Sequence, residues 1–497
     1  MNHPAHRAPA PRLLLAFVVG SLAACKVGPD YVEPTTPLAD QWTDQVTAEM
    51  ADSTPAIEEW WAALNDTVLT ELIRRAEIAN KDLAIAVGRV KEARALRGIA
   101  KGGLLPDIVL DGTYTRRLIS ENSPVGQSFV NAGEPITTAN VWNTSLGLSW
   151  EIDLFGRIRR TIEAATANME ASIEDYRDVL VTVYAEVALN YIDVRSFQAR
   201  IAFAEANAEG QLASKQLTQN RYAAGLTSAL DVAQAESNLR NTEAQIPPLQ
   251  VGLVAARNRL AVLLGEQPGS LIGTLADSAA IPSIDQDVTV GIPTDLLRRR
   301  PDIRRAEREL AAQTAIVGVA TADLYPSFSL TGFIELEAID FSDLFSGSSV
   351  GWGIIPGFSW PIFTAGKIRN RIKAEEARTE QALSFYEQTI LLALEDVQTA
   401  IVAYRQEQIR RDHLRNAVTA TTRSVFLVRT QYISGLTNFQ NYLDAQRSLF
   451  DQQDQLASSE GQVVKNLINL NRALDGGWAL DSMPPDQQPT ASANGGN

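Results

Sequence analysis

A stretch of 68 residues between Gly366 and Gly435 contains neither glycine nor proline, and a second stretch of 53 such residues lies between Gly156 and Gly210. Both are rich in alanine, glutamate, glutamine, arginine and leucine, which are good helix formers. At 1.5 Å per residue the longer stretch would form a helix of roughly 100 Å. Helices of that length do not fit a compact globular core, so the pattern predicts a coiled coil or an extended helical assembly.

Each helical stretch is followed by the tripeptide Gly-Leu-Thr, at Gly225-Leu226-Thr227 and at Gly435-Leu436-Thr437. Glycine readily adopts the left-handed conformation that ends a helix, and a new helical pattern begins after each threonine. The sequence therefore predicts two helical hairpins, with tips over 222–231 and 432–444.

Several motifs occur twice in the same order. LGLSWEIDLFGRIRR from Leu146 is echoed by PGFSWPIFTAGKIRN from Pro356, and RYAAGLT by QYISGLT, both at an offset of 210 residues. LLPDIVLDG and LYPSFSLTG lie 220 residues apart, so the first copy has a longer loop between its motifs. This period is too long for a solenoid. It indicates a duplicated structural half, over 61–271 and 294–475, with a link over 272–293.

Four segments alternate between apolar and small polar residues with a period of two, which indicates β-strands. They cover residues 107–117, 141–153, 326–337 and 350–363. A small sandwich with one face in a core would show this alternation. Tryptophan-rich faces opposite small polar faces, on strands of about ten residues, instead favour a membrane barrel.

Four strands are too few to close a barrel, because small closed barrels start at about eight. Open edges in lipid would leave backbone groups unpaired, which costs several kcal/mol each. Strands of other copies must therefore complete the barrel. Two copies would supply eight strands and three would supply twelve, and the pattern alone leaves both open.

The composition excludes several classes of protein. A formal net charge of -15 argues against nucleic acid as the main partner. Three histidines and one cysteine are too few for a structural zinc site or a disulfide framework. The sequence contains no P-loop, dinucleotide-binding glycine motif or nucleophile elbow, and no titratable residues at catalytic spacing. We therefore expect neither an enzyme nor a cofactor or metal site.

Residues 1–24 have the features of a secretory signal, since Arg7 and Arg12 precede an apolar run that is too short to cross a bilayer. The run ends in LAAC, which resembles the bacterial lipobox, where the cysteine is lipidated and becomes the first residue of the mature chain. Cys25 is therefore the predicted lipidation site, and Lys26 after it favours sorting to the outer membrane. An irregular segment over 25–60 follows, and a polar tail covers 476–497.

The sequence RRRPDIRRAEREL, from Arg298, looks at first like a nucleic-acid-binding patch. Pro301 suits the first position of a helix and Asp302 suits its first turn. Glu307 and Glu309 offset the positive charge of the arginines. We therefore expect this segment to be a solvated helix start.

The lipobox with CKVGPDYVEP, the Ser-Trp and Gly-Arg-Ile motif, RRRPDIRRAEREL and the duplicated Gly-Leu-Thr tips together resemble the lipoprotein branch of the TolC-like bacterial outer-membrane efflux proteins. The resemblance covers nearly all of the mature chain. It implies a mixed α and β membrane protein that assembles as a homotrimer. Twelve strands, four per subunit, would form an outer-membrane β-barrel, continued across the periplasm by a twelve-helix α-barrel with an equatorial belt of irregular segments.

The resemblance also implies a function. The chain would be the passive outer duct of a tripartite pump, receiving drugs, dyes, solvents or metal ions from an RND-type inner-membrane transporter through a periplasmic adaptor. It would be anchored in outer-membrane lipid and would extend into the periplasm. The tips, with Leu226 and Leu436 as exposed apolar anchors, are expected to dock the adaptor.

Gate residues of the family fall on Asp231, Tyr432 and Asp444 of this sequence. The resemblance implies that Asp231 and Tyr432 help tie neighbouring helices shut, and that Asp444 forms a carboxylate ring at the narrowest point. Thr437 stands where an arginine can join this network and Asn441 stands at one of two aspartate positions, so the network is expected to be smaller. From spacing alone, the two aspartates fit an ordinary solvated helical face.

Two other functions fit parts of the pattern. An outer-membrane duct for type I protein secretion would use the same fold, although lipidation disfavours it. A fibrous structural or adhesive coiled coil would need neither a gate nor a lumen. Single-channel conductance distinguishes a duct from a fibre, and growth with dyes and detergents distinguishes efflux from secretion.

Overall fold

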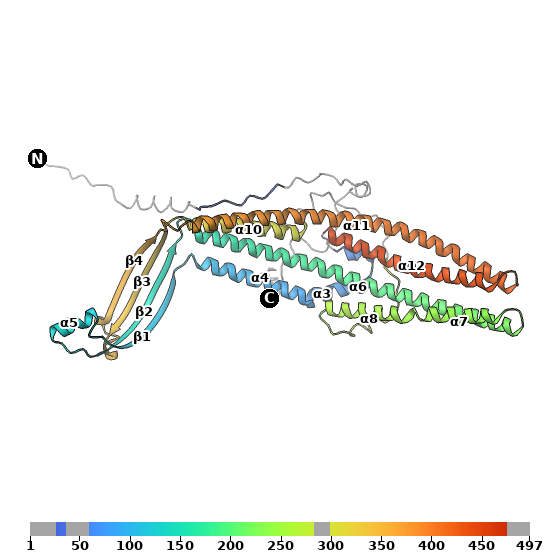
Figure 1. Cartoon of the computed structure of the whole chain (residues 1–497), viewed down its shortest axis with the longest axis horizontal. Coiled ribbons are helices and arrows are strands. Elements are labelled where there is room, and N and C mark those ends of the chain that lie inside the picture. Colours follow the sequence, from blue (N-terminus) through green and yellow to red (C-terminus); the bar gives the residue numbers. More distant parts are fainter. Residues whose placement is uncertain (1–25, 36–58, 283–298, 475–497) are drawn as a thin grey trace, which may run out of the picture. The chain divides into compact units, whose positions relative to one another are not determined.

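The computed structural model describes residues 26–35, 59–282 and 299–474 (Figure 1). The chain divides into two compact units, one made of residues 1–34, 92–170 and 307–384 and the other of residues 35–91, 171–306 and 385–497. The predicted signal over 1–24, Cys25, most of the segment over 25–60, the link from 283 onwards and the tail over 476–497 lie outside the described residues.

The first unit contains one antiparallel sheet in the order β1-β2-β3-β4 (Figure 1). Its strands are β1 (Asp107–Leu118), β2 (Thr138–Ile152), β3 (Ser327–Ala338) and β4 (Val350–Ser359). The last strand was expected to reach residue 363 but ends at Ser359. Pro361 explains the early end, because proline has no N–H to donate to a ladder.

The register places most of the apolar residues of the four strands on one face, although Val109, Phe333 and Ile355 lie on the other. Ile108 pairs with Leu148, Leu148 with Gly332, and Gly332 with Ile354. A second row crosses the sheet through Leu110, Leu146, Ile334 and Trp352. The opposite face carries rows such as Asp111, Ser145 and Glu335. The two faces that alternation predicted are therefore present in the paired sheet.

Short structures connect the strands at one end of the sheet. The longer loop of the first copy contains α5 (Pro124–Ala132), and the second copy has two 3-10 turns, η2 (Phe341–Asp343) and η3 (Gly347–Ser349). The side chain of Ser123 caps α5 by accepting from the backbone N–H of Gly126 at 3.0 Å. The additional residues of the first copy thus form an ordered helix.

Two helices have 67 residues each, α6 (Arg157–Ala223) and α11 (Lys367–Ile433). Helix α6 continues through Gly210, the residue that ends the glycine-free stretch. One glycine inside a helix lowers helix stability by only about 1 kcal/mol. The remaining long helices are α4 (Lys81–Gly102), α10 (Pro301–Ala322) and α12 (Phe439–Ala473). Within the described ranges, no helix is both long enough and apolar enough to cross a membrane.

The returning arm of the first hairpin is broken, whereas that of the second is continuous. The returning arm of the first hairpin consists of α7 (Ala229–Glu243) and α8 (Ile246–Leu263). The returning arm of the second hairpin is α12 alone. Pro247 and Pro248 stand in the first turn of α8, where proline is tolerated. The prolines therefore explain why a new helix starts there.

The main core of the second unit surrounds the middle of α6. Trp60 and Trp61 lie in η1 (Trp60–Leu64), and the Trp61 and Tyr184 rings are 4.9 Å apart. The next helix, α3 (Thr67–Ala79), is capped by Asp66, which also accepts a hydrogen bond from the Tyr191 hydroxyl at 2.5 Å. Burial and this carboxylate raise the pKa of Tyr191 to about 12, so the hydroxyl remains a donor.

The arginine-rich start of α10 is not the solvated surface that its sequence suggested. The helix does begin at Pro301, but Arg304 pairs with Glu174 at 2.9 Å and Arg305 with Asp175 at 2.8 Å. The arginine side chains are only about a third exposed, at 33% and 29%. The acidic partners on α6 explain the arginines, and local sequence around Pro301 could not reveal them.

Candidate functional site

The two hairpin tips have the same backbone geometry. In the first, the N–H of Gly225 donates to the Tyr222 carbonyl at 2.9 Å and the N–H of Leu226 donates to the Arg221 carbonyl at 2.8 Å. In the second, Gly435 donates to Tyr432 at 3.1 Å and Leu436 to Gln431 at 2.9 Å. This paired pattern is the Schellman motif.

A left-handed glycine stands at the same place in both tips. The φ of Gly225 is 72° and that of Gly435 is 75°, a conformation that side chains with a Cβ rarely adopt. The leucine after each glycine is exposed, with 65% of Leu226 and 80% of Leu436 accessible. Each tip thus presents one apolar side chain on a rigid turn.

Asp231 forms a capping box with Ser228, the N-cap residue of the helix that leaves the first tip. Its backbone N–H donates to the Ser228 hydroxyl at 3.3 Å, and its carboxylate accepts from the Ser228 N–H at 3.4 Å. The Thr227 hydroxyl also donates to this carboxylate. Asn441 has the equivalent place in the second tip, where its side-chain amide donates to the Thr437 hydroxyl at 2.8 Å. In one chain, both residues therefore stabilise their own tip.

Tyr432 is buried, with 2% of its surface exposed, in a cluster with Ala235, Phe439, Tyr442 and Leu443. Its ring lies 5.5 Å from that of Phe439 and stacks at 6.0 Å on that of Tyr442. Among the described residues, the buried Tyr432 hydroxyl has no hydrogen-bond partner. Tyr432 and Asp231 are thus not bonded to each other within one chain.

Arg221 joins the two tips and lies outside the predicted set of gate and docking residues. Its guanidinium donates to the Ile433 carbonyl at 2.9 Å and lies 4.8 Å from the centre of the Tyr432 ring. Gln431 stands at the equivalent position of the second tip. A basic residue in only one of two matching tips was the signal that could have identified it.

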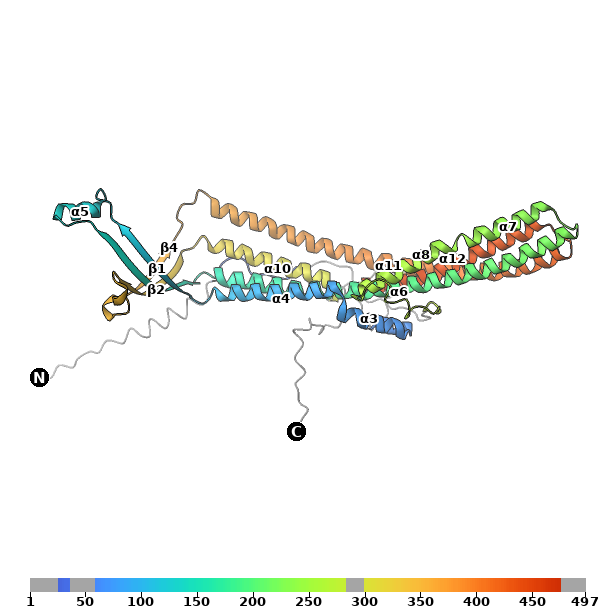
Figure 2. The same ribbon diagram turned by 90° about the horizontal axis from the view of Figure 1, so that it is seen from below.

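Polar contacts between the two hairpins continue away from the tips, where Figure 2 shows α6, α7, α11 and α12 side by side. Ser214 and Tyr442 share a hydrogen bond of 2.9 Å between their hydroxyls. Arg200 on α6 forms a two-pronged ion pair with Asp454 on α12, at 2.7 and 3.0 Å. The hairpins are therefore tied together by side chains from both repeats.

Asp444 is exposed on α12, and one of its carboxylate oxygens accepts from the Gln440 amide at 2.9 Å. Unlike Tyr432, it belongs to no buried cluster in the described parts of the chain. An exposed carboxylate close to the tip is free to meet solvent or another copy of the chain.

Aromatic side chains bound the apolar face of the sheet at both ends. At the loop end the Tyr114 and Trp142 rings are 4.2 Å apart, and Phe341 lies 5.0 Å from Trp142. At the helix end are Trp150 on β2 and Phe358 on β4. Trp150 lies eight positions after Trp142, which is roughly 26 Å of strand. Apolar bands of about 25 Å between aromatic girdles are typical of membrane barrels.

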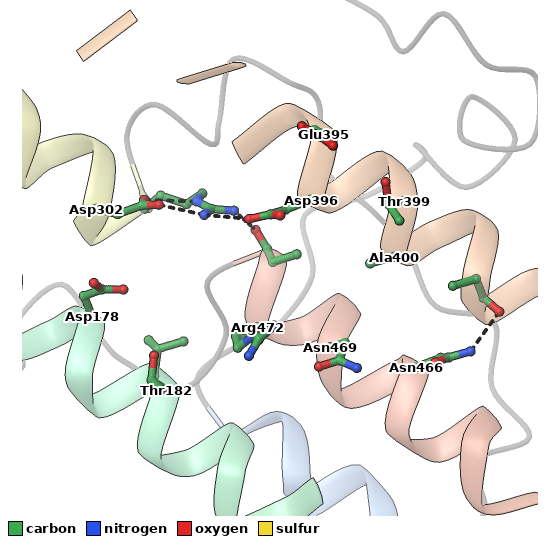
Figure 3. Close-up of a pocket in the computed structure, with 14 residues that line it drawn as sticks. Asp178, Thr182, Asp302, Glu395, Asp396, Thr399, Ala400, Asn466, Asn469 and Arg472 are labelled. Atoms are coloured by element: carbon green, nitrogen blue, oxygen red, sulfur yellow. Dashed lines mark hydrogen bonds and ion pairs between the residues drawn. The ribbon is translucent and has the colours of Figure 1, made fainter. Parts of the chain in front are cut away.

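A polar pocket of about 420 Å³ lies in the second unit, between α6, α10, α11 and α12 (Figure 3). Arg300 donates to Asp302 at 2.7 Å and to the Ala473 carbonyl at 2.9 Å, and it lies 3.4 Å from Asp396. Asp178 lines the same pocket, and burial raises the pKa of its carboxyl. Arg300 therefore connects the start of α10 with the end of α12 and with α11.

A sheet with one apolar face and two paired helical hairpins define an outer-membrane channel protein. The family described as outer membrane efflux protein matches residues 72–266 and 292–476. The chain belongs to this family. It is an outer-membrane channel of efflux systems that extends into the periplasm, and it is not an enzyme.

Known relatives agree with this assignment. Nodulation protein T of Rhizobium leguminosarum bv. trifolii is 31% identical over 457 residues, covering 92% of this chain and 95% of that protein. The antibiotic efflux pump outer membrane protein ArpC of Pseudomonas putida is 30% identical over 485 residues, covering 96% and 97%. The solved outer-membrane channel OprN superposes with a TM-score of 0.84 at 35% identity, covering 91% of this chain and all (100%) of that one. The predicted long helices and four antiparallel strands are confirmed.

Proposed function

We propose that three copies of the chain assemble into one duct, with a twelve-stranded β-barrel in the outer membrane and a twelve-helix α-barrel in the periplasm. The order of the sheet carries this proposal. β1 and β4 each pair with a single neighbour in the described sheet, so each has an edge of unpaired backbone groups. Such edges are costly in lipid, and pairing β1 of one copy with β4 of the next removes all of them.

The apolar face of the sheet supports a position in the membrane. Its central rows are exposed in the single chain, with Leu110 and Trp352 each 72% accessible. Exposed apolar surface of this extent marks a membrane or protein contact, and the aromatic residues at both ends fit a bilayer interface. Lipidation of Cys25 would add a second anchor, since one acyl chain alone binds membranes only marginally.

We further propose that the duct serves a tripartite pump for drugs and other toxic small molecules, with a periplasmic adaptor and an RND-type transporter as partners. The relative ArpC is an antibiotic efflux pump outer membrane protein, which supports this substrate class. The two rigid tips with exposed Leu226 and Leu436 are suited to dock the adaptor. The transporter supplies the energy, and this chain contributes a passive path.

The tips also contain the proposed gate. Asp444 is exposed, as a carboxylate ring requires. To bond across copies, Asp231 would have to leave Thr227 and Ser228, and the buried Tyr432 hydroxyl, which has no partner in the described chain, would have to become accessible. We therefore propose that the bond between Tyr432 of one copy and Asp231 of the next forms only in a closed assembly, in which the side chains of the tips are rearranged.

Three measurements test the proposal. A strain that lacks its own outer duct should regain resistance to dyes and antibiotics when it expresses this chain with its pump, and the purified protein should form channels in a planar bilayer. Photo-crosslinkers at Thr227 and Thr437 should capture the adaptor in that strain. Channels with restored secretion of a protein, but without drug resistance, would favour type I secretion. An absence of channels would contradict a duct.

A further inference from the structure

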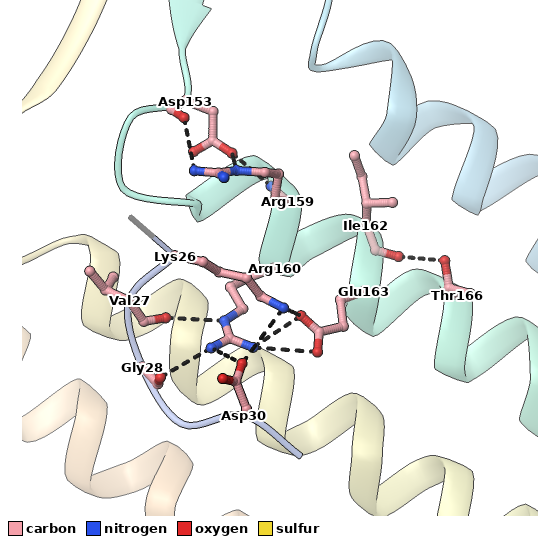
Figure 4. A network of polar contacts seen from close by, with 10 residues as sticks. All are labelled: Lys26, Val27, Gly28, Asp30, Asp153, Arg159, Arg160, Ile162, Glu163 and Thr166. Carbon is pink, nitrogen blue, oxygen red and sulfur yellow. Dashed lines mark hydrogen bonds and ion pairs between the residues drawn. The ribbon is translucent and has the colours of Figure 1, made fainter. Parts of the chain in front are cut away.

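The segment Lys26–Tyr31, here called the N-terminal strap, lies against α6 and α10 in the first unit (Figure 4). Its sequence, KVGPDY, is part of the motif that carried the family resemblance, yet the channel function assigns it no role. The backbone N–H of Val27 donates to the Phe155 carbonyl at 3.2 Å. The strap is thus joined to the turn between β2 and α6.

Arg160 is the centre of the contacts with the strap. It is fully buried, at 0% exposed, and its guanidinium donates to the carbonyls of Val27 and Gly28, each at 3.0 Å (Figure 4). It also pairs with Asp30 at 2.9 Å and with Glu163 at 3.0 Å. A buried guanidinium without partners is strongly destabilising, so Arg160 needs the strap in place.

Charge complementarity extends to the first strap residue. The Lys26 ammonium lies 2.5 Å from the Glu163 carboxylate and 3.8 Å from that of Asp30. Two positive side chains, Lys26 and Arg160, therefore contact the same two carboxylates, those of Asp30 and Glu163. The strap supplies one charge of each sign and α6 supplies the other two.

The strap and α10 also fit each other closely in shape. They cross at Gly28 and Gly318, two residues without a side chain. A Cβ on Gly28 would lie 2.5 Å from the Cα of Gly318, and a Cβ on Gly318 would lie 2.6 Å from Nε of Arg160. The φ of Gly28 is 84°, which also favours glycine. Only glycine at both positions allows this crossing.

Tyr31 forms the far end of the strap contact. Its hydroxyl donates to Glu307 on α10, the Arg308 guanidinium lies 5.6 Å from its ring centre, and the ring packs on Ala311 and Ala312. Burial and the Glu307 carboxylate raise the pKa of Tyr31, which keeps the hydroxyl a donor.

The duplication provides an internal comparison, because each residue of this seat has an equivalent in the other repeat. At an offset of 210, Arg160 corresponds to Asn370 and Glu163 to Lys373. At an offset of 220, Glu307 corresponds to Val87 and Arg308 to Gly88. The equivalent surface therefore lacks the guanidinium, reverses the charge that Lys26 meets and loses both partners of Tyr31.

We propose that Arg160, Glu163, Gly318 and Glu307 form a peptide-recognition seat for the chain's own N-terminal strap, and that the seat exists in only one of the two repeats. It fixes the point at which the mature N-terminus leaves the protein, beside the junction of β2 and α6. The seat recognises a Lys-x-Gly-x-Asp-Tyr pattern and acts whether or not Cys25 carries lipid.

Hydrogen–deuterium exchange of the full-length protein tests the seat. In Arg160→Leu, amide exchange over 26–31 should rise about tenfold or more, because buried charge-assisted bonds are lost. Asp30→Ala should have a smaller effect, since that carboxylate is 80% exposed. The matched control is Asn370→Leu, at the equivalent position of the other repeat, which should leave the strap unchanged.

Gly28→Ala is a second variant that tests the same proposal if Arg160→Leu does not fold. This variant changes no residue of α6 or α10, so both helices should keep their protection away from Arg160 while exchange over 26–31 rises by about the same factor. A strap that stays as protected as wild type in Gly28→Ala would overturn the proposal. An equal rise in Asn370→Leu would do the same, because the effect would not be specific to one repeat.

Discussion

Trp150 and Trp360 make the same hydrogen bond in the two repeats. The indole N–H of Trp150 donates to the Leu104 carbonyl at 3.0 Å, and that of Trp360 donates to the Leu324 carbonyl at 3.1 Å. Each carbonyl belongs to the turn between a helix and the strand that follows it. The duplicated Ser-Trp motif therefore ties the end of a returning strand to the start of its neighbour.

We predict that Trp150→Phe and Trp360→Phe each lower the free energy of unfolding by about 0.5–1.5 kcal/mol, the net contribution of one hydrogen bond. Phenylalanine keeps an aromatic ring but removes the donor. Urea unfolding of the detergent-solubilised protein, followed by tryptophan fluorescence, measures the change. Trp352→Phe is the matched control, since Trp352 lies on the exposed apolar face of the same sheet. An equal loss in the control would show that ring size, and not the bond, matters.

We predict that Cys25 is lipidated and that Cys25→Ser yields a precursor or an unlipidated chain. The short apolar run before LAAC motivates this prediction. Intact-mass analysis of the purified protein should show a mature chain that begins at Cys25 with added acyl groups. A mature chain with an unmodified Cys25 would contradict it. The strap in Cys25→Ser should remain protected, which separates lipidation from the seat.

Gly435→Val is expected to reduce drug resistance while the protein still assembles. A β-branched residue is strained at a φ of 75°, and the change lies next to exposed Leu436 at the tip. Minimum inhibitory concentrations in a strain with a complete pump give the readout. Gly210→Val is the control, because Gly210 lies within α6 and not at a tip. Resistance equal to wild type in Gly435→Val would argue against docking at this tip.

Periodicity and turn residues predicted much of this fold, because strand faces and helix ends are encoded locally. The two tips fall at Gly225 and Gly435, and the apolar rows lie on one face as alternation required. Pairings between distant residues were not predictable in the same way. Nothing near Arg304 indicates that Glu174 is its partner.

In the candidate site too, local features were predictable from the sequence and contacts between distant residues were not. Exposure of Asp444 is compatible with its expected role, but burial of Tyr432 depends on aromatic residues of α12 and on Arg221 of the other repeat. Comparison of the repeats position by position would have found Arg221 and Arg160, since each differs in kind from its equivalent, Gln431 or Asn370.

Asp444→Asn is expected to lower the cation selectivity of the channel. Three symmetric copies of an exposed carboxylate near the tips would attract cations, and the formal charge of -15 acts in the same direction. The reversal potential across a salt gradient in a planar bilayer measures selectivity. Asp451→Asn removes the same charge from the same helix face about 10 Å further from the tip, so a smaller effect there would show that position at the tip matters. A reversal potential that does not change in Asp444→Asn would show that Asp444 faces away from the lumen.

We expect substitutions of the two proposed gate residues, Asp231 and Tyr432, to have different effects on stability. Asp231→Ala should destabilise the first tip by about 1 kcal/mol, because it removes part of a helix cap. Tyr432→Phe should leave stability equal or slightly higher, because it removes a buried hydroxyl that has no partner in the described chain. Urea unfolding measures both, and a large loss in Tyr432→Phe would reveal a hydroxyl bond formed in the assembly.

The double variant Tyr432→Phe with Asp231→Ala tests whether these residues also close the channel. A bond between the hydroxyl of one copy and the carboxylate of the next would contribute about 1.5–3 kcal/mol, and three of them would total several kcal/mol. About 5.5 kcal/mol moves a two-state balance from 1:99 to 99:1, so conductance should rise and large antibiotics such as vancomycin should enter. Tyr432→Phe with Asn441→Ala is the control, since the side-chain amide of Asn441 holds Thr437 of the other tip at the position equivalent to Asp231. Wild-type conductance in an assembled double variant would limit Tyr432 and Asp231 to folding of the tips.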